Sequence, residues 1–182
     1  MKDLENEDEA SMNPKTKNHP TSKIRQIIAW TLVFFWMSLI VSLSAQPAQQ
    51  SDQLSRKFTK VLVEVITPFV PGEYIDNLDD ALGKANAIVR KQAHVGVYFV
   101  LGFLTINAFR RSGIQTASSY WLAFSLSVAF AVSDEIHQLY VPGRSGEIMD
   151  VLYDSTGALL GIGAYGLLTK IKKQTKKKEV AN

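Results

Sequence analysis

Side chains that could transfer protons or bind an anion are concentrated in residues 133–154, between two strongly apolar segments. This stretch reads SDEIHQLYVPGRSGEIMDVLYD, and its chemically useful members are Asp134, Glu135, His137, Gln138, Arg144, Asp150 and Asp154. Ionisable groups at membrane depth are costly, usually face the interior of a helix bundle and often mark functional sites. The stretch is therefore the main part of a candidate site.

Helical spacing places several of these groups on common faces. Asp134 and Gln138 are four residues apart, so they share one side of a helix, with His137 beside them. Asp150 and Asp154 share a face with a later glycine pair four residues apart, a spacing that allows close helix packing. The carboxylates should therefore lie where two helices meet.

Pro142-Gly143-Arg144 predicts a tight turn that presents an arginine. Arginine is the side chain best shaped for bidentate contact with a carboxylate or a phosphate. Two interpretations stay open. Arg144 could form an internal ion pair with a nearby carboxylate (Asp134, Glu135 or Asp150), or it could bind an anionic ligand.

Four segments are apolar enough to cross a membrane, which requires about 20 residues of helix. They are residues 24–44, 93–109, 119–139 and 151–169. The first could also be a cleaved signal peptide, but its apolar core is longer than is usual there and an acidic tail precedes it. These spans predict an all-α fold: an integral membrane four-helix bundle.

The distribution of charge supports this topology. The net charge is only +3, and most Lys and Arg residues flank apolar segments, which argues against a nucleic-acid partner. Because cytoplasmic loops are enriched in Lys and Arg, the basic residues near 23–25, 110–111 and 170–178 place both termini in the cytoplasm. Residues 1–23 should form a polar, disordered tail and residues 170–182 a basic tail. The sequence does not indicate an oligomeric state.

The outer segment 45–90 predicts one or two short amphipathic helices. Apolar residues recur at helical spacing from Leu54 to Phe69, and Pro68, Pro71 and Gly72 should end that helix. A second pattern runs from Ile75 to Val89. Both helices should lie on the outer membrane surface or cap the bundle.

Topology brings a third segment to the same membrane face. His94 opens the second span just after Arg90 and Lys91. A catalytic role would fall on His94, Asp134 and Glu135. The predicted ligand-binding set is Arg90, Lys91, His94, Asp134, Glu135, His137, Gln138, Arg144, Asp150 and Asp154. A metal held by His94 and His137 is chemically possible, but no metal-ligand spacing is present, so we expect neither a metal nor another cofactor.

An ordered set of short motifs resembles the VanZ-like family of small bacterial membrane proteins. The motifs are SAQP at 44–47, RKxAHxxxYxxLG at 90–102, SDExHQ at 133–138, PGR at 142–144 and DxxxDxxG at 150–157. The resemblance implies that residues 24–169 form a four-helix domain in the bacterial plasma membrane. It also implies a link to resistance, because the namesake lowers susceptibility to the glycopeptide teicoplanin. Val97 stands where the family often has an acidic residue.

Three functions are compatible with these residues. The first is binding of an anionic or amphiphilic ligand at the outer leaflet, such as a lipid-linked cell-wall intermediate or a lipoglycopeptide. The second is a hydrolase or transferase acting on a lipid-linked substrate by His and carboxylate chemistry. The third is a purely structural or partner-binding role in which the charges only pair helices. Whether a reaction is catalysed stays open at this level.

Overall fold

The computed structural model describes residues 20–66 and 78–181, which form helices and no strand. The elements are α1 (Pro20–Ser44), α2 (Ala48–Ile66), α3 (Leu78–Arg111), α4 (Ser118–Gln138) and α5 (Ile148–Ala181). The predicted all-α class is confirmed.

Three of the described helices are long and apolar enough to cross a membrane. These candidate spans are Lys23–Ser44 in α1, Gly83–Arg111 in α3 and Ile148–Glu179 in α5. The fourth predicted span corresponds to α4, which has 21 residues but does not reach the same hydropathy. Serines along α4 and the polar residues at its C-terminal end lower its mean hydropathy. A count of four spans therefore stays a prediction.

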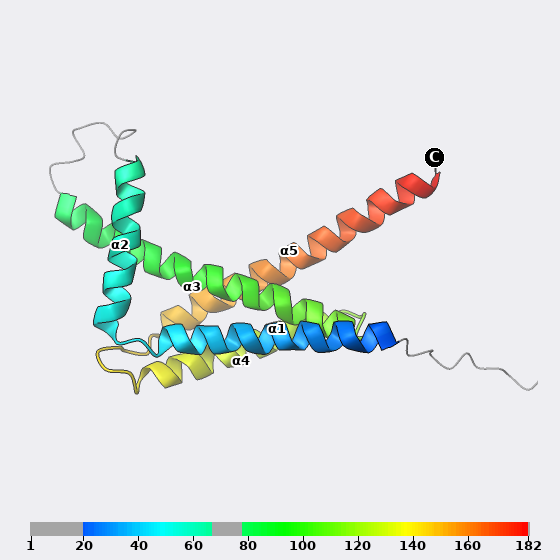
Figure 1. Cartoon of the computed structure of the whole chain (residues 1–182), viewed down its shortest axis with the longest axis horizontal. Helices are drawn as coiled ribbons and strands as arrows, with labels where there is room; N and C mark the ends of the chain where they lie inside the picture. The colour runs from blue at the N-terminus through cyan, green and yellow to red at the C-terminus, as the bar shows by residue number, and fades with distance from the viewer. Residues whose placement is uncertain (1–19, 67–77, 182) are drawn as a thin grey trace, which may run out of the picture.

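The end of α1, the end of α4 and the start of α5 lie together at one end of the molecule (Figure 1). α1 and α4 lie side by side, whereas α3 and α5 cross each other and form the most extensive contact between two helices. α2 stands at a steep angle to the bundle, at the end where α1 and α4 finish and α5 starts. The start of α1 and the end of α3, with their basic residues, lie at the opposite end.

Glycines allow α3 and α5 to approach closely. A Cβ atom added to Gly157 or Gly161 of α5 would overlap backbone atoms of α3, and one added to Gly102 of α3 would overlap α5. Small residues let transmembrane helices pack backbone to backbone, so the expectation from the glycine spacing is confirmed. This contact places Asp154, one turn before Gly157, beside His94.

Tryptophan side chains fix α1 along α3. The Trp36 indole N–H donates to the Val97 carbonyl oxygen at 2.9 Å, and the Trp30 indole N–H donates to Ser112 Oγ at 3.0 Å. The Trp30 ring also meets Phe109 edge-on, with 5.1 Å between ring centroids. Buried indoles need such a partner for the N–H group.

α2 confirms the first predicted amphipathic helix. Its apolar side chains Phe58, Val61 and Val65 are each at least 60% exposed, so the bundle does not cover them. An uncovered apolar face is what a helix lying at a membrane surface requires.

A polar contact attaches α2 to α3. Asn86 Nδ2 donates to Asp52 Oδ1 at 2.8 Å, and Arg56 Nε donates to Asp52 Oδ2 at 2.7 Å. The hydrogen bond from Arg56 is the main cause that lowers the pKa of Asp52 below its ordinary value. The carboxylate is therefore charged, and the contact is intact, at neutral pH.

Some helices have other bounds than the predicted elements. The second short helix does not exist separately, because its described part, from Leu78, is the start of α3, which continues without a break past Arg90. α3 is therefore longer than the span predicted at 93–109, and the bounds of that span stay a prediction. α5 continues to Ala181, so the predicted basic tail is helical up to that residue; lysine is a good helix former. The predicted disordered N-terminus, up to residue 19, and the signals at Pro68, Pro71 and Gly72 lie outside the described residues.

Candidate functional site

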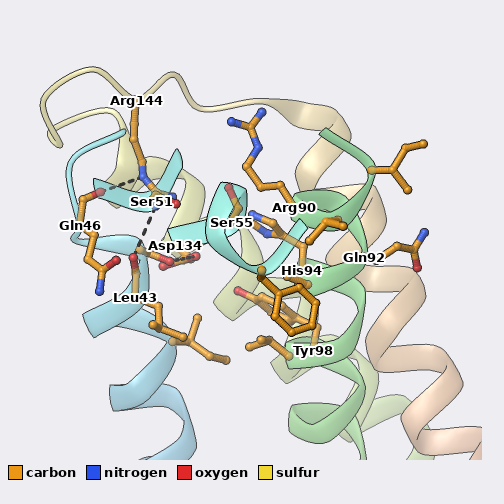
Figure 2. A pocket seen from close by; sticks show the side chains of 17 residues that line it. Leu43, Gln46, Ser51, Ser55, Arg90, Gln92, His94, Tyr98, Asp134 and Arg144 are labelled. Atoms are coloured by element: carbon orange, nitrogen blue, oxygen red, sulfur yellow. Dashed lines mark hydrogen bonds between the residues drawn. The ribbon is translucent and has the colours of Figure 1, made fainter. Parts of the chain in front are cut away.

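A cavity of about 850 Å³ lies between α1, α2 and α3 (Figure 2). Most of its wall is apolar, with side chains such as Ile40, Phe58, Ile88 and Val97. Arg90, His94, Asp134 and Arg144 line one end of it, the polar end, and Tyr98 lies below them in Figure 2. Small-molecule sites are typically apolar clefts of about 300–1,000 Å³ with a few placed polar groups.

A second cavity of about 70 Å³ adjoins the polar end of the first. The two share Ser51, Arg90, His94 and Arg144, so an apolar space leads into a polar one. Charged and amide side chains dominate the smaller wall, which also includes Gln138, Glu147 and Asp150. This shape suits a molecule with an apolar chain and a charged head.

His94 is held by a buried carboxylate. Its Nδ1 lies 3.1 Å from Asp154 Oδ1, and Asp154 is fully buried and lines neither cavity. With Asp154 ionised and the imidazole neutral, Nδ1 carries the hydrogen and Nε2 has a free lone pair. Among the described residues, none is hydrogen-bonded to Nε2. The site therefore presents an oriented imidazole whose basic nitrogen is available to a ligand.

Asp134 forms the opposite wall of the polar end. Its Oδ2 accepts hydrogen bonds from Ser44 Oγ at 2.7 Å and from Gln138 Nε2 at 3.3 Å. Its Oδ1 and the Tyr98 hydroxyl are buried and have no partner in the described part of the chain. Buried polar atoms are normally hydrogen-bonded, yet two unpaired atoms lie in the wall of the cavity.

The loop between α4 and α5 presents Arg144 as the sequence predicts. The Arg144 N–H donates to the Val141 carbonyl oxygen at 3.1 Å, and Gly143 has a φ of +75°. Pro142 precedes Gly143, which is the arrangement of a type II turn. The glycine is required because other residues rarely adopt this φ.

Among the described residues, the guanidinium of Arg144 bonds only to neutral oxygens. Its Nε donates to the Gln46 carbonyl and its Nη1 to Gln138 Oε1, both at 3.0 Å. A longer bond of 3.5 Å reaches the Leu43 carbonyl, so Arg144 also caps the C-terminal end of α1. The ion pair considered for Arg144 is not formed with any described carboxylate. Burial lowers the pKa of this guanidinium, with the charge of Asp134 opposing the shift, so an anion would offset a real desolvation cost.

A comparison with known protein families matches residues 29–169 to VanZ/LLP1. The match covers more than half of the chain. The chain belongs to the VanZ/LLP1 family. The matched range includes both cavities and the His94–Asp154 pair, and it confirms the family resemblance seen in the sequence. No curated protein and no solved structure shows significant similarity to the chain.

The fold of this VanZ/LLP1 chain brings most of the predicted ligand-binding residues together. The residues that line at least one cavity are Arg90, His94, Asp134, Gln138, Arg144 and Asp150, and Asp154 stands behind His94.

Three predicted site residues point elsewhere. Glu135 lines neither cavity; its Oε2 accepts the Glu147 backbone N–H at 2.9 Å and so holds the α4–α5 loop. The Lys91 ammonium lies 5.2 Å from the centroid of the Tyr153 ring, away from both cavities. His137 is exposed on another face of α4. The metal site considered for His94 and His137 is not assembled, since no group of three or more His, Asp or Glu side chains in the described ranges could hold a metal.

Other VanZ/LLP1 site residues had no predicted role. Tyr98, Ser44, Ser51 and Ser55 all line the larger cavity. Helical spacing offered a signal for some of them, because Tyr98 lies four residues after His94 and the two serines of α2 are four residues apart. No spacing rule places Ser44 near Asp134, since 90 residues separate them.

Proposed function

We propose that this VanZ/LLP1 protein binds an anionic amphiphile within its membrane domain. The apolar chain would occupy the larger cavity, and the anionic head would lie at its polar end and in the smaller cavity. One observation carries this function: Arg144, half-buried and without a carboxylate partner in the described chain, lies where the apolar and polar cavities join.

The apolar part of the site supports a lipid-like ligand. Phe58 of α2 lines the larger cavity and is 64% exposed, so a chain in the surrounding lipid could reach the cavity beside α2. The same helix exposes Val61 and Val65. A ligand that partitions into the membrane would therefore arrive at the site from the bilayer.

The polar part supports an anionic head. Arg90 is exposed, lines both cavities and makes no hydrogen bond or ion pair with another described residue. Together with Arg144 it offers two guanidinium groups, which suit phosphate or carboxylate.

Two ligand types have this chemistry. One is a lipid-linked cell-wall intermediate, whose phosphate is attached to a long apolar chain. The other is an acylated glycopeptide, which the teicoplanin phenotype of the family namesake suggests. The positions of the Lys and Arg residues favour a site at the outer leaflet of the plasma membrane, where both ligands would be met.

A binding assay tests the function. The purified full-length chain in lipid nanodiscs is titrated with a fluorescent long-chain lipid phosphate and with the corresponding lipid alcohol. The phosphate form should bind more tightly, and Arg144→Gln should weaken it about 10- to 100-fold, because a charge-assisted hydrogen bond contributes about 1.5–3 kcal/mol. Teicoplanin added as a competitor decides between the two ligand types.

Lys91→Gln is the matched control. It removes a positive charge next to Arg90 in sequence, but its ammonium faces Tyr153 and lines neither cavity. Its affinity should equal that of the wild type. Equal binding of phosphate and alcohol, or unchanged affinity in Arg144→Gln, would contradict the proposed function.

A further inference from the structure

We infer that the site is catalytic, and that His94 is the general base for hydrolysis of a terminal phosphoryl group on a lipid. This inference rests on the proposed function, since the same amphiphile must first bind. It adds a reaction and a substrate class. It also gives a role to the His94–Asp154 pair, which binding alone would not require.

The arrangement of His94 is that of a general base. The carboxylate of Asp154 fixes the ring orientation and the Nδ1–H form, and it would stabilise the imidazolium once a proton is taken. A histidine that only joined α3 to α5 would not need to line both cavities. Burying a carboxylate in a membrane domain is costly, and Asp154 Oδ2 is left without a partner in the described chain. A functional role explains why the pair is tolerated there.

The smaller cavity has the size and charge for a phosphoryl group. At about 10–15 Å³ for each water-sized group, its volume of about 70 Å³ holds roughly the five heavy atoms of a phosphate. Arg90 and Arg144 line it together with His94, which matches the two negative charges of a phosphate monoester. Glu147 and Asp150 also line it, but they are exposed and half-exposed, so solvent screens their repulsion.

The reaction balances without a further reactant. A water molecule gives one proton to His94 Nε2 as its oxygen attacks phosphorus, and the bond between phosphorus and the lipid-side oxygen breaks. The leaving oxygen takes a proton from solvent, and the imidazolium releases its proton to solvent. The products are inorganic phosphate and a lipid alcohol, or a lipid monophosphate when the substrate is a diphosphate. Arg90 and Arg144 would stabilise the charge on the phosphoryl oxygens during this step.

The experiment measures phosphate release from long-chain lipid monophosphate and diphosphate by the full-length chain in nanodiscs. His94→Asn should lower kcat about 100- to 10,000-fold, the usual contribution of a general base, while the affinity for the lipid phosphate changes little. Imidazole in the buffer should restore part of the activity, which a structural role would not allow. Asp154→Asn, which removes the carboxylate charge, should also lower kcat. His137→Asn is the control and should keep wild-type turnover, because His137 is exposed and lines neither cavity.

The outcomes separate the two proposals. If the wild type binds the lipid phosphate but releases phosphate from neither substrate, the catalytic inference is overturned and the binding function stands. If the wild type does not bind, both fail. Turnover that persists in His94→Asn and in Asp154→Asn would also overturn the inference. Lipid binding by each variant shows that it is folded, and if one variant does not bind, the other carries the test.

Discussion

At the scale of single residues, Gln138 connects the charged groups around the polar end of the cavity. Its amide nitrogen donates to Asp134 Oδ2 and to Glu135 Oε1, and its amide oxygen accepts from Arg144. An amide can serve acids and a guanidinium at once because it has both donors and an acceptor. A single neutral side chain therefore bridges the two carboxylates and Arg144.

We expect Gln138→Leu to destabilise the protein. The change would leave buried hydrogen-bonding groups without partners, and each such group costs about 1–3 kcal/mol. Thermal unfolding of the purified protein in detergent measures the loss as a lower Tm. His137→Leu, one position away on an exposed face, is the control and should unfold near the wild-type temperature. Equal Tm values for the two variants would contradict the role given to Gln138.

At the scale of elements, the crossing of α3 and α5 decides whether the site exists. Gly157 packs against the α3 backbone beside His94, and Asp154 is one helical turn away. The distance of 3.1 Å between the imidazole and the carboxylate depends on this approach. A change in the contact between α3 and α5 should therefore alter both the stability of the protein and its turnover of lipid phosphate.

Gly157→Ala should push the two helices apart. Overpacking of this kind typically costs about 1–3 kcal/mol, and we expect a lower Tm together with weaker lipid-phosphate turnover. Gly163→Ala is a matched control on the same helix, because an added Cβ there meets nothing within 4 Å. Thermal unfolding and phosphate release are measured for both. A Gly157→Ala protein that behaves like Gly163→Ala would refute the close contact.

At the scale of the whole molecule, the end of α1, the end of α4 and the start of α5, which contribute residues to the cavities, lie at one end of the bundle. The basic ends of α1 and α3 lie at the other end (Figure 1). If α4 crosses the membrane, the loop before it and the loop after it face opposite sides. The chain has no cysteine, so single cysteines can be placed without background labelling.

Cysteine labelling tests this topology in intact cells. Ser145→Cys, in the loop after α4, should react with a membrane-impermeant maleimide added outside. Thr116→Cys, in the loop before α4, should react only after the membrane is permeabilised. Both positions are exposed, so protein burial does not limit either reaction. Labelling of both or neither from outside would contradict a spanning α4, and the reverse pattern would contradict the predicted orientation.

The sequence by itself determined the features that depend on neighbouring residues. Helical periodicity and apolar length predicted the all-α class, the amphipathic α2 and the glycine contact of α5. Pro142-Gly143 predicted the turn that presents Arg144, because the φ of +75° is local backbone chemistry. A separate helix was predicted before Arg90 because the apolar pattern of the sequence changes there. The helix α3 nevertheless continues through this change.

Only the tertiary structure decided which polar groups pair. Ser44 meets Asp134 across 90 residues, and Arg144 meets the Gln46 carbonyl across 98. Such partners depend on the rotation and crossing of helices, which no local pattern encodes. The same packing turned Lys91 and His137 away from the site and placed His94 against Asp154. Sequence thus supplied the chemical groups, and helix packing decided which of them face the cavity, because a shift of one residue along a helix turns a side chain by about 100°.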